Sequence, residues 1–160
     1  MITGYDSFMP LDFCEEFLNF ASASNWLPSK TGTQDGAFTY FIRDKDDGYF
    51  TKEISRRVAE VTGSTVKPIV SNFNGLSAGM KVGWHTDSEF GSTQTVVWYP
   101  NFGWDEGMGG ELEILDGDKL LRVEPSFNRC LIYGADVIHR VNEHRNKQFM
   151  RLSVAIHFTN

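Results

Sequence analysis

The chain has 160 residues and a formal charge of −6, which is the size of a single domain with an acidic balance. Its apolar fraction of 41%, with 13 Phe, 5 Tyr and 4 Trp, is enough for a packed core and excludes intrinsic disorder. No apolar run has the length of a transmembrane helix, and the first residues lack the basic and apolar regions of a secretory signal. We therefore expect a soluble, cytoplasmic protein that does not bind membranes.

Cysteine content and charge exclude further classes of function. Cys14 and Cys130 are too few for a disulfide framework or a cysteine-based zinc site. Lys and Arg form no continuous block, so sequence-independent binding to the phosphates of a nucleic acid is disfavoured. Cys130 precedes Leu131 and Ile132 and is interpreted as a small buried apolar residue.

The N-terminal third is expected to combine helices and one strand. Asp12, with Glu15 three residues later, has the form of a capping box, and apolar residues at helical spacing then predict a helix over about residues 12–22. Residues 36–42 read as a strand. A second apolar face at helical spacing predicts another helix that ends near Gly63.

From Val66 onward the apolar period changes to two, and turn residues punctuate the gaps. Short strands at regular spacing are typical of a sandwich or jelly roll rather than of βαβ units. The expected fold class is therefore β-rich α+β, a jelly roll over residues 66–160 supported by residues 1–65. The eight predicted strands cover about residues 66–73, 80–87, 93–99, 111–115, 119–124, 129–133, 138–143 and 149–158.

Two histidines and an aspartate form a candidate metal site. His85 and Asp87 are two residues apart at the end of a predicted strand, so their side chains project from the same face. By the same alternation, Val82 and Trp84 are expected on the opposite, apolar face. His139, at the start of a later strand, supplies a third ligand. Two imidazoles and one carboxylate form the facial set that binds Fe(II) and leaves coordination positions open.

The last predicted strand offers an anion site. Its alternate residues Leu152, Val154, Ile156 and Phe158 are apolar, whereas Arg151, Ser153, Ala155 and His157 share the other face. A planar guanidinium beside a hydroxyl suits a carboxylate, which it binds through two parallel hydrogen bonds. We expect this face to bind an anion.

These residues, taken in order, resemble the Fe(II)/2-oxoglutarate-dependent oxygenases. The resemblance spans about residues 66–158 and is greatest to the prolyl 4-hydroxylase type, including its oxygen-sensing branch. It implies a double-stranded β-helix and one oxygenase domain over residues 1–160. The matching motifs are His85-Thr86-Asp87, Tyr99-Pro100-Asn101, Gly109-Gly110-Glu111-Leu112, the segment 123–129, His139-Arg140-Val141 and Arg151.

The resemblance implies His85, Asp87 and His139 as the ligands of Fe(II), with 2-oxoglutarate and O₂ as co-substrates. It also implies the reaction, in which 2-oxoglutarate is converted to succinate and CO₂ while a substrate carbon is hydroxylated. Family halogenases have Gly or Ala where Asp87 stands, so the carboxylate indicates a hydroxylase. The implied substrate is a peptidyl or free amino acid, with proline as the first hypothesis.

The co-substrate contacts are carried over in the same way. Arg151 is expected to pair with the distal carboxylate of 2-oxoglutarate, Tyr99 to place its hydroxyl on that carboxylate, and Ser153 to provide a second contact. A Tyr that often precedes the HxD motif is absent, and Asn72 or Asn74 is expected to replace it.

His157 stands where the family frequently has Trp, and strand alternation places it in the same interior as Arg151. His144 is interpreted as an exposed turn residue, and Gly109-Gly110 as a bulge or turn. Three alternatives remain open: a nucleic-acid demethylase-type oxygenase on the same fold, a zinc hydrolase, and a non-catalytic jelly-roll binding module.

Overall fold

The computed structural model describes residues 1–29 and 39–159, which contain two antiparallel β-sheets. In spatial order, the strands of the larger sheet are β1 (Thr3–Tyr5), β9 (Arg129–Gly134), β6 (Gln94–Tyr99), β11 (Arg151–Thr159), β4 (Lys67–Leu76), β3 (Thr39–Ile42) and β2 (Leu27–Ser29). The smaller sheet contains β5 (Val82–His85), β10 (His139–Val141), β7 (Leu112–Asp116) and β8 (Lys119–Val123).

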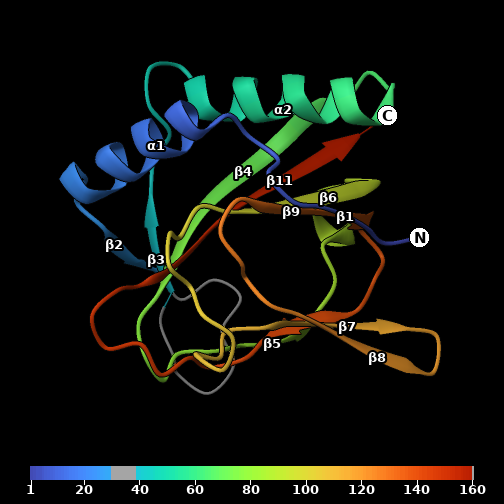
Figure 1. The fold of residues 1–160 in the computed structure, drawn as a ribbon. Helices are drawn as coiled ribbons and strands as arrows, with labels where there is room; N and C mark the ends of the chain where they lie inside the picture. Colours follow the sequence, from blue (N-terminus) through green and yellow to red (C-terminus); the bar gives the residue numbers. More distant parts are fainter. Residues whose placement is uncertain (30–38, 160) are drawn as a thin grey trace.

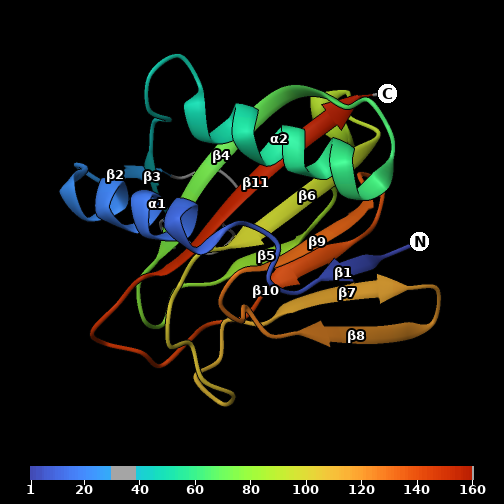
Figure 2. The same ribbon diagram turned by 45° about the horizontal axis from the view of Figure 1, so that its top comes forward.

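Three layers result from this arrangement. Helices α1 (Leu11–Ala23) and α2 (Tyr49–Thr62) cover one face of the larger sheet, and the smaller sheet faces its other side (Figure 1). Turned by 45°, the strands β4, β11, β6, β9 and β1 lie side by side beneath the helices (Figure 2). The predicted jelly roll with helical support is confirmed, and all eight strands predicted from residue 66 onward are present with ends shifted by a few residues.

The predicted helices are confirmed, but the predicted cap of the first helix is wrong. Helix α1 begins at Leu11, and its first backbone bond runs from the Cys14 N–H to the Pro10 carbonyl (3.1 Å). Asp12 therefore lies inside the first turn, where its carboxylate accepts the N–H of Phe13 (2.9 Å). Helix α2 ends before Gly63, whose φ of +68° is the left-handed conformation that glycine adopts without strain.

The two short strands β1 and β2 are not predicted from the sequence. Strands β1 and β2 have three residues each, too few to show a period of two, and β2 contains Pro28. Of the strand predicted over residues 36–42, the part Thr39–Ile42 is observed as β3, and residues 36–38 lie outside the described residues. No helix in the described part of the chain is long and apolar enough to cross a membrane.

The main core lies between the helices and the larger sheet. The buried residues Phe13 and Phe17 of α1 pack against Phe50 of α2 and Trp98 of β6 in edge-on or tilted contacts, with ring centroids 5.0 to 5.6 Å apart. The apolar face of β11 contributes to the same core, as its alternation predicts. It consists of Leu152, Val154, Ile156 and Phe158.

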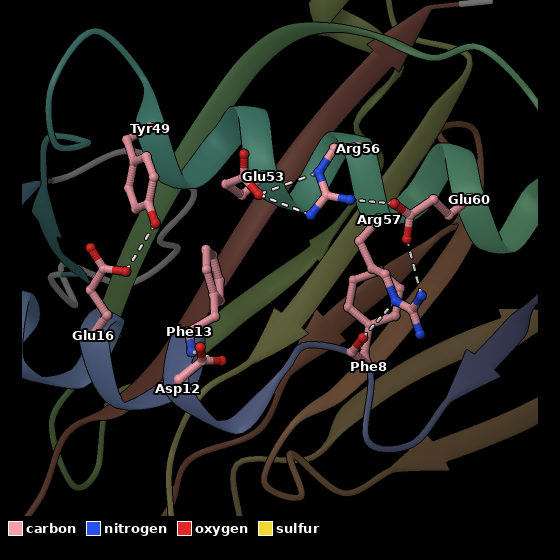
Figure 3. A network of polar contacts seen from close by, with 9 residues as sticks. All are labelled: Phe8, Asp12, Phe13, Glu16, Tyr49, Glu53, Arg56, Arg57 and Glu60. Atoms are coloured by element: carbon pink, nitrogen blue, oxygen red, sulfur yellow. Dashed lines mark hydrogen bonds and ion pairs between the residues drawn. The ribbon is translucent and has the colours of Figure 1, made fainter.

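Polar contacts fasten the helices to each other and to the N-terminal segment (Figure 3). The Arg57 guanidinium of α2 donates its Nε–H to the Phe8 carbonyl (2.9 Å) and also pairs with Glu60 (3.1 Å). The Tyr49 hydroxyl donates to Glu16 of α1 (2.9 Å). These partly exposed contacts each add little energy, with the Tyr49–Glu16 bond joining the two helices and the Arg57–Phe8 bond joining α2 to the N-terminal segment.

Asn128 connects the N-terminal segment to the core of the larger sheet. Its side-chain oxygen accepts the N–H of Met9 (2.9 Å) and the indole N–H of Trp98 (3.0 Å), while its amide donates to the Met9 carbonyl (2.7 Å). Asn128 is 2% exposed, so none of these three partners has water to replace it.

We expect Asn128→Ala to lower the free energy of unfolding by about 3 kcal/mol, because it leaves three buried polar groups without a partner. Urea unfolding followed by circular dichroism measures the change. Asn25→Ala, at an exposed position, is the control and is expected to change the free energy of unfolding by less than about 0.5 kcal/mol. Equal stability of the two variants would contradict the role given to Asn128.

Candidate metal centre and anion-binding cavity

The three candidate metal ligands come together where strand β5 meets strand β10. His85 and His139 are direct cross-strand partners, and their ring centroids lie 4.2 Å apart. Asp87 follows β5 and is fixed by its own N–H, which donates to the Ala135 carbonyl (2.8 Å). One ligand atom from each of the three residues lies within 4.8 Å of the other two, so a single metal ion can contact all three.

Backbone carbonyls fix the orientation of both imidazoles. Nδ1 of His85 lies 2.8 Å from the Gly83 carbonyl, and Nδ1 of His139 lies 2.9 Å from the Val137 carbonyl. A carbonyl oxygen only accepts, so each Nδ1 carries the proton and each Nε2 keeps its lone pair. Both lone pairs are therefore available to a metal, in the arrangement that metal-binding histidines usually show.

Asp87 completes a donor set for Fe(II). One carboxylate oxygen lies 3.7 Å from Nε2 of His85, and the other lies 3.6 Å from Nε2 of His139. The side chain is nearly fully buried, and Thr95 donates its hydroxyl proton to Oδ2 (2.8 Å). Two imidazoles and one carboxylate on one side of an open cavity fit Fe(II) and leave positions for further ligands.

The expected alternation along β5 is wrong at one point. Val82 pairs with Val141 and His85 pairs with His139, so β5 has one more residue than β10 between these pairs. This bulge turns Val82 and His85 toward the same cavity, where strict alternation would separate them. Trp84 points outward instead, and the Arg140 guanidinium lies over its ring at 4.6 Å from the centroid.

Arg151 places a buried positive charge in the cavity. It is 2% exposed, donates its Nε–H to the Gly110 carbonyl (2.7 Å) and has its Nη1 3.5 Å from the Ser153 hydroxyl. Its Nη2 and the hydroxyl of the fully buried Tyr99 have no hydrogen-bond partner within the described chain. A sheet-edge ion pair is thereby excluded for Arg151 among the described residues. Unpaired donors beside a guanidinium fit the carboxylate of a bound anion.

Gly110 and His144 form the wall behind Arg151. Gly110 has a φ of +79°, and a Cβ there would lie 3.0 Å from Cδ of Arg151. His144 was expected to be exposed, and this is wrong: it is 2% exposed, its Nε2 donates to the Leu76 carbonyl (2.6 Å), and Trp104 packs edge-on against its ring. The backbone of the Gly-Gly turn thus holds the guanidinium, which is more than the bulge expected from the sequence.

One cavity of about 410 Å³ contains the triad and Arg151 together. Strand β11 contributes the polar face that its alternation predicts, and β4 contributes Asn72 and Asn74 from the neighbouring position. The His157 ring is buried and stacks on Phe90, with centroids 4.6 Å apart. The cavity lining also includes Ser29, Thr39, Phe41, Glu89, Tyr99, Tyr133, Ser153, Ala155 and His157.

Burial controls the charge state of the cavity groups. It lowers the pKa of His139 and of His157 below the ordinary value of 6.5, although the Asp87 carboxylate opposes the shift at both residues. Burial also raises the pKa of Tyr99, an effect that the charge of Arg151 partly offsets. His139 and His157 are therefore neutral, and the Tyr99 hydroxyl keeps its proton, near neutral pH.

The sequence of this site also matches a known protein family. Residues 70–159, more than half of the chain, match the 2OG-Fe(II) oxygenase superfamily. The chain belongs to this superfamily. No curated protein sequence matches it.

Several solved structures share the fold of this chain. A prolyl-4-hydroxylase of Pseudomonas putida has a TM-score of 0.73 at 18% identity, covering 99% of this chain and 92% of that chain. A prolyl hydroxylase from Trichoplax adhaerens, solved with a peptide of the hypoxia inducible factor, has a TM-score of 0.75 at 16% identity, covering 99% and 83%. The 2-oxoglutarate-dependent epimerase SnoN of nogalamycin biosynthesis has a TM-score of 0.76 at 11% identity, covering 99% and 78%.

Membership of the 2OG-Fe(II) oxygenases makes the chain an oxidoreductase that uses Fe(II), 2-oxoglutarate and O₂. The contacts of two residues near these sites, Thr95 and Gly110, are not predicted from the sequence. Thr95 shares a strand face with Val97 and Tyr99, so alternation along β6 was the signal that could have found it. Gly110 acts through its carbonyl, which carries no sequence signal for the contact with Arg151.

The lowered pKa values predict how the metal-free protein responds to acid. The unfolded chain binds protons on His139 and His157 more readily than the folded chain, so the stability they contribute is present above pH 6.5 and lost as the pH falls below it. Urea unfolding with a chelator present, between pH 7.5 and 5.5, is expected to show this loss. His157→Phe is expected to show a shallower dependence on pH, and an unchanged slope would contradict the assignment.

Proposed function

We propose that this oxygenase hydroxylates an amino-acid residue within a peptide, with proline as the first substrate, and that His85, Asp87 and His139 hold its Fe(II). One observation carries the proposal: two imidazoles with free Nε2 atoms and a buried carboxylate face the same cavity as an unpaired buried arginine. A binding module would have no reason to bury both an open metal donor set and an unpaired charge, since each costs free energy until a ligand is bound.

The residues on β11 and β6 are suited to hold 2-oxoglutarate. We assign Arg151 and the Tyr99 hydroxyl to its distal carboxylate, with Ser153 as a further contact, because their free donors converge on one part of the cavity. The apolar walls nearby exclude water and strengthen these contacts. When bound, Fe(II) and 2-oxoglutarate would let O₂ act as the oxidant, with one oxygen atom entering succinate as 2-oxoglutarate loses CO₂ and the other entering a substrate C–H bond.

The wall of the cavity offers hydrogen-bonding groups for a peptide. Asn72 and Asn74 on β4 place amide groups in this wall, and Thr39 and Phe41 of the neighbouring strand β3 also line the cavity. Amides can both donate to and accept from a peptide backbone. The fold shared with two prolyl hydroxylases, one of them solved with a peptide, supports a prolyl residue as the target.

We also propose that residues 1–160 act as one oxygenase domain. Helices α1 and α2 share their core with β11 and β6, the strands that carry Arg151 and Tyr99. Helices α1 and α2 therefore support the site from behind the sheet, the strands from β4 onward carry the metal and anion donors, and Thr39 and Phe41 of β3 add to the cavity wall.

Substitutions in the two halves of the site are expected to separate metal binding from co-substrate binding. Arg151→Met removes the guanidinium at similar volume and is expected to weaken 2-oxoglutarate binding by at least about 30-fold with little effect on metal affinity, because a buried charge pair is lost. His139→Ala is expected to abolish tight metal binding. The visible charge-transfer band of the Fe(II)–2-oxoglutarate complex, titrated without O₂, measures both, and unaltered co-substrate affinity in Arg151→Met would exclude its assigned role.

The substrate assignment is tested with peptides that contain a single proline, each compared with the same peptide carrying alanine. Only the proline peptide is expected to stimulate succinate formation and to gain one oxygen atom that derives from labelled O₂. His139→Ala serves as the inactive control. Succinate formed without oxygen gain by the peptide would point to another oxidative outcome, such as the epimerisation of SnoN, and no stimulation by any proline peptide would overturn proline as the target.

A further inference from the structure

A chain of polar side chains runs from Asp87 into the larger sheet. The Thr95 hydroxyl lies 2.8 Å from Oδ2 of Asp87 and 3.3 Å from Nδ1 of His157. Nε2 of His157 lies 3.3 Å from the side-chain nitrogen of Asn72. These residues stand on β6, β11 and β4, three adjacent strands of the larger sheet, and Thr95 and His157 are direct cross-strand partners.

The hydrogen-bonding capacity of each group permits one direction along this chain. A carboxylate only accepts, so the single hydroxyl proton of Thr95 points to Asp87. The Thr95 oxygen then accepts from His157, which therefore carries its proton on Nδ1. The remaining lone pair on Nε2 accepts from the amide of Asn72. Every bond is thus directed from Asn72 toward Asp87.

The three side chains are also held rigidly. His157 is 2% exposed, and its ring is stacked on Phe90 of the short 3-10 helix Ser88–Phe90 that directly follows Asp87. Thr95 is 1% exposed and lies on a central strand. Nδ1 of His157 is 3.8 Å from Oδ2 of Asp87, too far for a direct hydrogen bond, so Thr95 is the link between them.

We propose that Thr95, His157 and Asn72 form a positioning relay that keeps Asp87 bound to the metal through one oxygen. The hydrogen bond from the Thr95 hydroxyl draws electron density from Oδ2. Oδ1, which lies on the side of His85, is therefore the stronger metal donor. Binding through one oxygen matters because a carboxylate that used both would occupy a position that the two co-substrates need. The relay rests on the proposed role of Asp87 as a metal ligand.

The test uses Co(II), whose visible absorption reports the geometry of its ligands, with the metal alone as probe. Thr95→Val has nearly the same shape but no hydroxyl, and it is expected to weaken Co(II) binding about 10- to 100-fold and to change the absorption bands. Thr95→Ser restores the hydroxyl and is expected to recover both. Thr93→Val, just before β6 at an exposed position, is the matched control and is expected to bind as the unsubstituted protein does.

His157→Phe tests whether the relay extends beyond Thr95. It keeps a ring to stack on Phe90, and it is expected to shift the Co(II) bands and weaken binding by itself but to add nothing in the Thr95→Val background, because both act through one chain. Additive losses, or an unaffected His157→Phe variant, would overturn the relay. If Thr95→Val fails to fold by circular dichroism, His157→Phe and Thr95→Ser carry the test.

The two proposals fail in different ways. If the unsubstituted protein binds no Co(II), the metal site itself is wrong. If it binds Co(II) and Thr95→Val binds equally tightly with unchanged absorption, the metal site stands and the relay is overturned.

Discussion

Strand β11 lies between the apolar core and the polar cavity, and its register decides which side chains enter each of them. Its apolar face packs beneath α1 and α2, while Arg151 and His157 on the other face enter the cavity. Pairing with β6 on one side and β4 on the other fixes its register. A slip by one residue would place the Arg151 guanidinium in the aromatic core, which costs far more than the lost pairing.

The helical layer offsets the unfavourable features of the cavity. Arg151, Tyr99 and the Nε2 atoms of the two triad histidines leave donors and acceptors without a hydrogen-bond partner among residues 1–29 and 39–159, and this lowers stability until ligands bind. The aromatic cluster beneath α1 and α2 buries large apolar surfaces and stabilises the same sheet from its other face. Helices α1 and α2, which lie outside the matched residues 70–159, therefore provide the stability that a preorganised site requires.

Precision in the cavity comes mainly from backbone carbonyls. Gly83 and Val137 orient the imidazoles, and Gly110 orients the guanidinium. Each carbonyl fixes where a proton or a charge points, so the side chains are positioned before any ligand binds. A substitution at Gly110 would disturb Arg151 directly, because a Cβ at position 110 would occupy the space of the Arg151 side chain.

The two helices, the eight later strands and the face of β11 on which Arg151 lies can be predicted from the sequence, because local apolar periodicity decides which side of an element is buried. His85, Asp87 and His139 can also be singled out from it by type and order. The bulge in β5, the burial of His144 and the pairing of Thr95 with His157 could not be predicted in this way. These depend on which distant strands become neighbours, and long-range hydrogen bonding, rather than local pattern, sets that choice.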